Sequence, residues 1–138
     1  MRHALDLQRA LIARLSDDPG LAAALGGSKV FDAVPHAAKG VAPPWLSVGD
    51  EAIEAAGAAD APAWRHRLVL SLFSDARGSA EIKGAMAALA AALDAPLAVD
   101  GARVADLRLE KASVARKGRW RRADCTWLAL LEAAPAPG

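Results

Sequence analysis

The side chains that could bind a metal ion are few and widely spaced in this chain. His3, His36 and His66 are its only histidines, and no two of them lie three or four positions apart, as ligands on one helix do. Cys125 is the only cysteine, which excludes an intrachain disulfide and a cysteine metal cluster. We therefore expect no metal site and no cofactor.

The residues needed for nucleophilic catalysis also lack a recognisable arrangement. No Gly-x-Ser-x-Gly motif presents a serine to a histidine. Cys125 lies in the middle of a predicted strand, where a buried and unreactive thiol is expected. Gly26-Gly27 is not followed by the Lys-Ser/Thr pair of a phosphate-binding loop. These features indicate that the chain is not an enzyme and that its function lies in a surface.

A dense run of basic residues is the most site-like feature of the sequence. Between residues 103 and 122 lie eight of the 17 lysines and arginines, with Asp106 and Glu110 as the only acids. Eight minus two gives this segment a charge of +6, so the remaining residues must sum to −5 for the total of +1. The surface that we predict consists of Arg108, Lys111, Arg116, Lys117, Arg119, Arg121 and Arg122.

Two interpretations of this basic surface are open. Basic residues on an exposed strand discourage edge-to-edge aggregation, which would be a purely structural role. Eight like charges within 20 residues exceed what solubility requires, however, and this favours contact with nucleic acid or with an acidic protein face. Trp120 is the only aromatic residue among them, which is too few for a dedicated single-strand binder.

Length and composition predict one domain over residues 1–132 and a flexible C-terminal tail over residues 133–138. The N-terminal stretch carries charges throughout, unlike a secretory signal. No run approaches the roughly 18 apolar residues of a membrane helix. We expect a cytoplasmic product that makes no contact with a membrane.

The elements around the basic run are predicted from periodicity. The segment Trp64–Phe73 alternates as a strand, and Ile82, Ala85, Met86, Leu89 and Leu93 form the apolar stripe of a helix that Ser79 could cap. A first helix over residues 3–16 and a short one ending at Gly26-Gly27 precede it. Further strands are expected at residues 30–34, 45–49, 102–116 and 119–132, with a hairpin tip at Lys117-Gly118.

This pattern predicts the α+β class. We expect a mainly antiparallel sheet of about four or five strands, with one long helix packed on a face and an N-terminal helix. The expected order is α-β-β-β-α-β-β. Residues 51–63, with Glu51, Glu54 and Asp60, are interpreted as a flexible loop that could order at an interface, because Gly57, Asp60 and Pro62 argue against regular structure.

The order of these segments, more than any single motif, resembles a known family. It runs from the N-terminal helix through VFDAVP and PPWLSVG to the strand ending LSLFS, Arg77-Gly78, an alanine-rich helix, Asp100-Gly101 and the basic hairpin. In this order the chain resembles the tail-completion, or tail-terminator, proteins of long-tailed phages and gene transfer agents. The resemblance spans about residues 5–132. One departure is Phe73, where such proteins often have tryptophan.

The resemblance implies a structural protein without bond chemistry. It implies a hexameric ring on the end of the tail tube, which stops tail polymerisation and joins the tail to the head-side connector or stopper protein. DNA would pass through the lumen without sequence specificity. Assembly would occur in the cytoplasm, before release as part of a phage-like particle. Two alternatives remain: a small basic nucleic-acid-binding regulatory protein, and a small enzyme with an unrecognised pocket.

Overall fold

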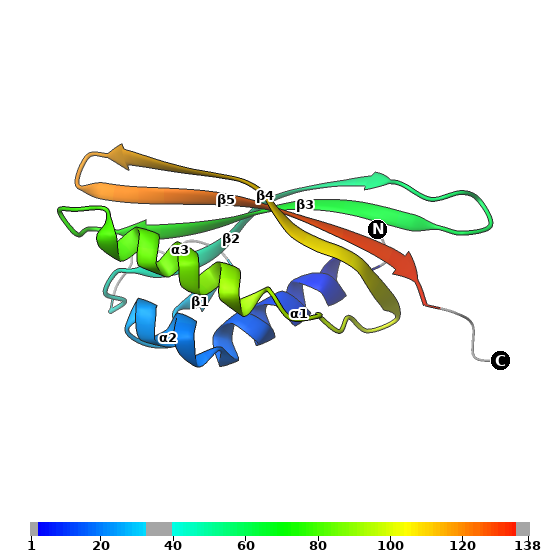
Figure 1. Cartoon of the computed structure of the whole chain (residues 1–138), viewed down its shortest axis with the longest axis horizontal. Coiled ribbons are helices and arrows are strands. Elements are labelled where there is room, and N and C mark those ends of the chain that lie inside the picture. Colours follow the sequence, from blue (N-terminus) through cyan, green and yellow to red (C-terminus); the bar gives the residue numbers. More distant parts are fainter. Residues whose placement is uncertain (1–2, 33–39, 135–138) are drawn as a thin grey trace.

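A computed structural model describes residues 3–32 and 40–134, which form a sheet with helices on one side (Figure 1). Its elements are α1 (Ala4–Asp17), α2 (Pro19–Leu25), β1 (Val30–Phe31), β2 (Trp45–Ala55), β3 (Ala63–Ser74), α3 (Ala80–Ala92), β4 (Ala102–Lys117) and β5 (Trp120–Ala133). The predicted strand at 30–34 and the predicted tail at 133–138 fall partly outside the described residues. No helix within residues 3–32 and 40–134 is long and apolar enough to cross a membrane.

The sheet has five strands in the order β1-β2-β3-β5-β4. β1 pairs with β2 in parallel, whereas the β2–β3, β3–β5 and β5–β4 pairs are antiparallel. The longest unbroken register joins β3 to β5, from Ala63 opposite Glu132 to Ser74 opposite Arg121. This mixed architecture confirms the predicted α+β class.

The two faces of the sheet differ because side chains alternate along each strand. On the helix-covered face, Leu68, Leu70 and Leu72 of β3 are buried. The apolar stripe of α3 packs there through Ile82, Ala85 and Leu89, as its spacing predicted. Helix α1 adds Leu7, Leu11 and Leu15, so the core lies between the sheet and all three helices.

The helices differ from the expectation of one long helix. α1 has 14 residues and α3 has 13, so neither dominates, and α2 is a separate helix of seven residues. Asp18 caps α2 by accepting a hydrogen bond from the backbone N–H of Leu21 at 2.8 Å. Ser79 makes no such bond to α3. Instead, the nearby Ser74 hydroxyl pairs with Glu81 at 2.8 Å and orders the approach to α3.

The interpretation of residues 51–63 as a flexible loop is wrong for residues 51–55 and for Ala63, which lie in strands. β2 continues to Ala55, so Glu51 and Glu54 lie within a strand and only Asp60 lies on the connecting turn. The turn is itself closed by hydrogen bonds from Ala56 N to Ala63 O at 2.9 Å and from Ala61 N to Ala58 O at 3.0 Å. Pairing with β3 therefore overrides the weak strand propensity of this alanine-rich stretch.

We expect truncation of the central strand to cost far more stability than truncation of the edge. Leu70 is fully buried, so Leu70→Ala should lower the free energy of unfolding by about 2–5 kcal/mol. Leu109 is 43% exposed on β4, and the matched variant Leu109→Ala should lower it by less than about 1 kcal/mol. Urea unfolding followed by circular dichroism measures both; equal losses would contradict the described core.

Candidate interaction surface at the β4–β5 hairpin

The β4–β5 hairpin ends in a tight turn that carries its basic residues to one end of the molecule. Lys117 pairs with Trp120, which leaves Gly118 and Arg119 as the two-residue loop. Gly118 has φ 62°, a conformation that favours glycine. The tip lies beside the turn between β3 and α3 (Figure 1), where the Arg121 guanidinium donates to the Arg77 carbonyl at 2.7 Å.

Apart from Arg121, which contacts the Arg77 carbonyl, the predicted basic residues fall into two groups. Arg108 pairs with Asp106 at 3.2 Å and Arg122 with Asp124 at 2.8 Å, so both have a carboxylate partner within their own strand. Lys111, Arg116, Lys117 and Arg119 are exposed and have no carboxylate within 4.0 Å among the described residues. The unpaired positive charge therefore lies along the outer half of β4 and at the hairpin tip.

An aromatic cluster lies next to the tip of the hairpin, on the face away from the helices. The Trp45 ring lies 5.2 Å from the Trp120 ring and 5.8 Å from the Phe73 ring, centroid to centroid. Arg119 stacks over Trp120 at 4.9 Å, and Arg122 over Phe73 at 5.2 Å. Trp120 is thus packed on one side and covered on another, which disfavours its use as a stacking platform for bases.

Asp124 links the hairpin to the central strand. Its carboxylate accepts hydrogen bonds from the Ser71 hydroxyl at 2.6 Å and from Arg122 at 2.8 Å. Partial burial, the largest single influence, acts to raise the pKa of Asp124, but these two hydrogen bonds and the charges of Arg122 and Lys117 together lower it below its ordinary value. The carboxylate therefore stays charged and fixes the direction of Arg122.

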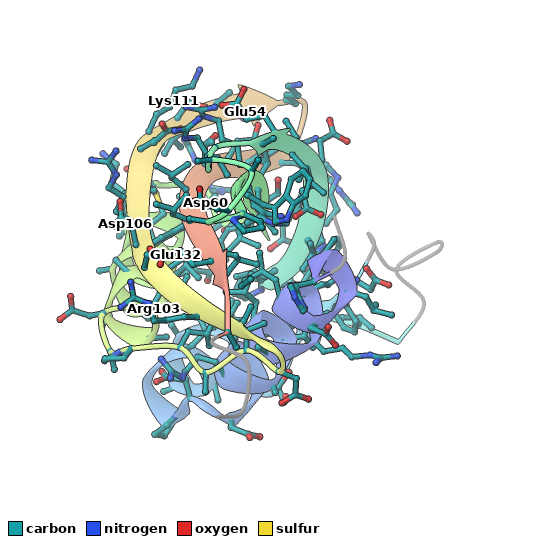
Figure 2. The ribbon with its side chains drawn as sticks, turned by 90° about the vertical axis from the view of Figure 1, so that its right-hand side faces the viewer. Glu54, Asp60, Arg103, Asp106, Lys111 and Glu132 are labelled. Carbon is teal, nitrogen blue, oxygen red and sulfur yellow. The ribbon has the colours of Figure 1, made fainter. Side chains whose placement is uncertain are left out.

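The predicted acidic set lies at the other end of the molecule but does not form one surface. Glu51 points into the helix side and pairs with the ring of His66 at 2.9 Å. Glu54 lies on the open face, where hydrogen bonds from Arg65 and then Arg67 hold its pKa below the ordinary value. Asp60 is on the exposed β2–β3 turn, which faces the reader in Figure 2.

An ion-pair ladder on the open face was missed from the sequence. Arg67 of β3 reaches Glu54 of β2 at 3.3 Å and Glu110 of β4 at 3.0 Å. Between β3 and β4 lies Leu128 of β5, which is only 5% exposed although none of the described helices covers that face. The alternation of Arg65 and Arg67 was a signal for this ladder, but their partners depend on strand pairing that the sequence does not reveal.

His66, Ser71 and Asp124 do not come together as a catalytic arrangement. His66 is fully buried on the helix side, whereas Ser71 and Asp124 face the opposite side of the sheet. Within residues 3–32 and 40–134, no group of three or more His, Cys, Asp or Glu side chains could hold a metal ion. Cys125 is 3% exposed, and burial raises its thiol pKa to about 11. The thiol is therefore protonated at neutral pH and a poor nucleophile.

We expect Cys125 to react with a maleimide only when the protein unfolds. At pH 8 the native thiol is both shielded and protonated, so labelling should be at least roughly a hundredfold slower than in denaturant. Mass spectrometry over time measures the rate. The exposed variant Ser113→Cys is the positive control and should be labelled at once. Fast native labelling of Cys125 would contradict its burial.

We also expect a pH dependence from Asp124. The pKa of the Asp124 carboxyl is lower in the folded protein than in the unfolded chain. The charged carboxylate therefore stabilises the fold at pH values above the unfolded pKa, and this contribution is lost as the pH falls below about 4. The melting temperature of the wild type should therefore drop more between pH 6 and pH 3 than that of Asp124→Asn. Asp94→Asn, at an exposed turn residue, should follow the wild type. Parallel curves for all three proteins would contradict this role.

The chain is similar to a known protein family and to solved structures. Residues 9–132 match the model of a family described as Tail completion protein gp17. Among solved structures, a chain from the virion of a native gene transfer agent (GTA) particle is 33% identical and superposes with a TM-score of 0.86. That similarity covers 95% of this chain and 98% of the other. No match is found among curated proteins.

Proposed function

The chain belongs to the tail completion protein gp17 family of phage-like tails, and from this we propose that it forms a ring that caps the tail tube. The ring, a hexamer, stops tail polymerisation and joins the tail to the head-side connector or stopper protein. The family match over residues 9–132 is the observation that carries this proposal. The similarity to a chain of a gene transfer agent virion supports it, because that chain is part of an assembled particle.

The charge distribution supports contacts with two different partners. Residues 111–122 contain six basic and no acidic residues, whereas residues 50–60 contain four acidic and no basic ones. These segments lie at opposite ends of the strands (Figure 1). In the proposed ring the β4–β5 hairpin meets the tail tube, and the β2–β3 turn with Asp60 faces the head-side connector.

In the proposed ring, DNA passes through the lumen without sequence-specific contacts. Its phosphates could be attracted by Arg or Lys side chains, but Trp120 is already packed against Trp45 and Arg119, which disfavours base stacking. Assembly takes place in the cytoplasm, and the protein then leaves the cell in a phage-like particle. The proposal assigns the chain no catalytic step and no cofactor.

Electron microscopy of particles made without this protein tests the proposal directly. We expect tails of uncontrolled length, or heads without tails, because nothing would stop the tube or join it to the head. Re-expression of the wild-type chain should restore tailed particles, which serves as the control. Particles of normal length and composition in the absence of the protein would refute a terminating role.

A narrower test concerns the hairpin tip. We expect Lys117→Glu combined with Arg119→Glu to reduce tailed particles by at least roughly tenfold, because like charges across an interface cost several kcal/mol. Arg121 and Arg122 stay unchanged, since they contact the Arg77 carbonyl and Asp124 within the fold. The ratio of tailed to untailed heads measures the effect.

A matched control carries the same change in charge on the helices, at the exposed residues Arg9 and Lys83. Arg9→Glu combined with Lys83→Glu should leave tailed particles at the wild-type level. Normal assembly with the tip variant would show that the hairpin is only a solvated edge. Binding of the isolated wild-type protein to DNA, with a steep dependence on salt, would instead favour the nucleic-acid-binding alternative.

A further inference from the structure

The outer edge of β4 is long, exposed and without a partner strand. β4 is the last strand of the sheet, and within residues 40–134 only β5 pairs with it along its length. Every residue from Arg108 to Arg119 is exposed, including Leu109 at 43% and Val114 at 37%. The last irregularity in the pairing of β4 with β5 lies between Leu109 and Lys111. Residues 111–117 are therefore regularly paired with β5 and form a free edge on their other side among the described residues. Such an edge offers unpaired backbone groups to another strand.

The opposite edge of the sheet is also open over part of its length. β1 pairs only with Leu46 and Ser47 of β2. After an irregularity between Val48 and Glu51, β2 runs on to Ala55 with β3 on one side and, among the described residues, no strand on the other. Among residues 3–32 and 40–134, residues 51–55 are therefore a second regular free edge. Asp50, just before it, and Glu54, within it, are exposed.

We propose that the β4 edge of one copy pairs with the β2 edge of the next copy in the ring. The inference rests on the proposed ring and names the contact that closes it. The occupant is a second copy because the two edges are complementary in charge: Lys111 and Arg116 lie on one, Asp50 and Glu54 on the other. Backbone pairing supplies affinity, and the opposite charges select the register.

The strand directions agree with this pairing. β3 runs against β2, β5 against β3, and β4 against β5, so β4 is antiparallel to β2. Across the sheet Glu51 lies level with Leu109 and Val48 with Ala112, so pairing residues 111–117 with residues 51–55 needs a stagger of about five residues between copies. A ring whose strands are inclined to its axis, as in closed barrels, supplies such a stagger, and the β4 edge then meets the next β2 edge in the antiparallel sense. The interface is head-to-tail, with different surfaces on the two copies, which is the kind that closes into rings.

The side chains also match on each face of the joined sheet. On the helix side of β4, Leu109 lies opposite Trp127 and Val114 opposite Ala123, and both project beyond the cover of the helices. Ile53 faces the same side on β2, opposite His66, and supplies an apolar partner. On the open side, Lys111 of one copy approaches Glu54 of the next; Figure 2 shows both side chains towards the top of the sheet.

Charge exchange between the two edges tests the pairing. One variant makes the β2 edge basic, Asp50→Lys with Glu54→Lys, and the other makes the β4 edge acidic, Lys111→Glu with Arg116→Glu. Each variant alone places like charges at every contact, so its amount in purified particles should fall by at least roughly tenfold. Expressed together, the two variants can alternate around the ring, and incorporation should recover to within about threefold of wild type.

Controls separate this contact from folding and from net charge. Two double variants serve as controls: Asp17→Lys with Asp94→Lys, and Arg9→Glu with Lys83→Glu. They make the same changes in net charge at exposed positions on or beside the helices, and they should be incorporated normally. Circular dichroism of each edge variant should show a folded protein. Wild-type incorporation of either edge variant alone, or no recovery on co-expression of two folded variants, would overturn the proposal.

Cross-linking gives a second measurement that does not depend on charge. In a Cys125→Ser background, Ala52→Cys and Ser113→Cys place thiols on exposed residues of the two edges, both on the open face. In particles containing both single-cysteine chains, a short thiol cross-linker should join unlike chains far more than like chains. Equal yields would refute edge pairing. That result would leave the proposed ring function standing, because the ring function is refuted only if particles lacking the protein are normal.

Discussion

The unbroken antiparallel pairing of β3 with β5 is the constraint on which the other features depend. It joins strands that lie on either side of α3 in the sequence, and it fixes twelve residues of β3, from Ala63 to Ser74, against β5. The buried leucines of β3 then face α3, and the alternate residues face solvent. Because β2 and β4 each add to one side of this pair, their hairpin turns are carried to opposite ends of the molecule.

Strong local patterns made much of this architecture predictable. The alternation in Trp64–Phe73, the apolar stripe of α3 and the Asp18-Pro19 helix start are signals within a few residues, and the structure confirms each of them. The second half of β2 was not predictable, since an alanine-rich segment with Gly57 and Pro62 has little intrinsic strand preference. Its strand conformation comes from pairing with β3, which is a long-range property.

The interaction surface likewise combines features that the local sequence predicts with features that depend on long-range contacts. The sequence alone located the basic hairpin, and its tip differs by only one residue from the predicted Lys117-Gly118. Which basic residues carry unpaired charge depends on contacts: Arg122 is held by Asp124 two residues away, whereas Arg121 is held by the Arg77 carbonyl from a distant turn. The acidic residues were grouped in one loop, but Glu51 and Glu54 point to opposite faces of a strand.

The separation of charge between the two ends of the strands also has a kinetic consequence. Six basic residues at one end and four acidic ones at the other give the free subunit a permanent electric dipole along its long axis. Near a charged assembly surface such a dipole turns the approaching subunit before contact, so more of its diffusional encounters are productive. Screening by salt acts over about 8 Å at physiological ionic strength, which confines this steering to the last step of approach.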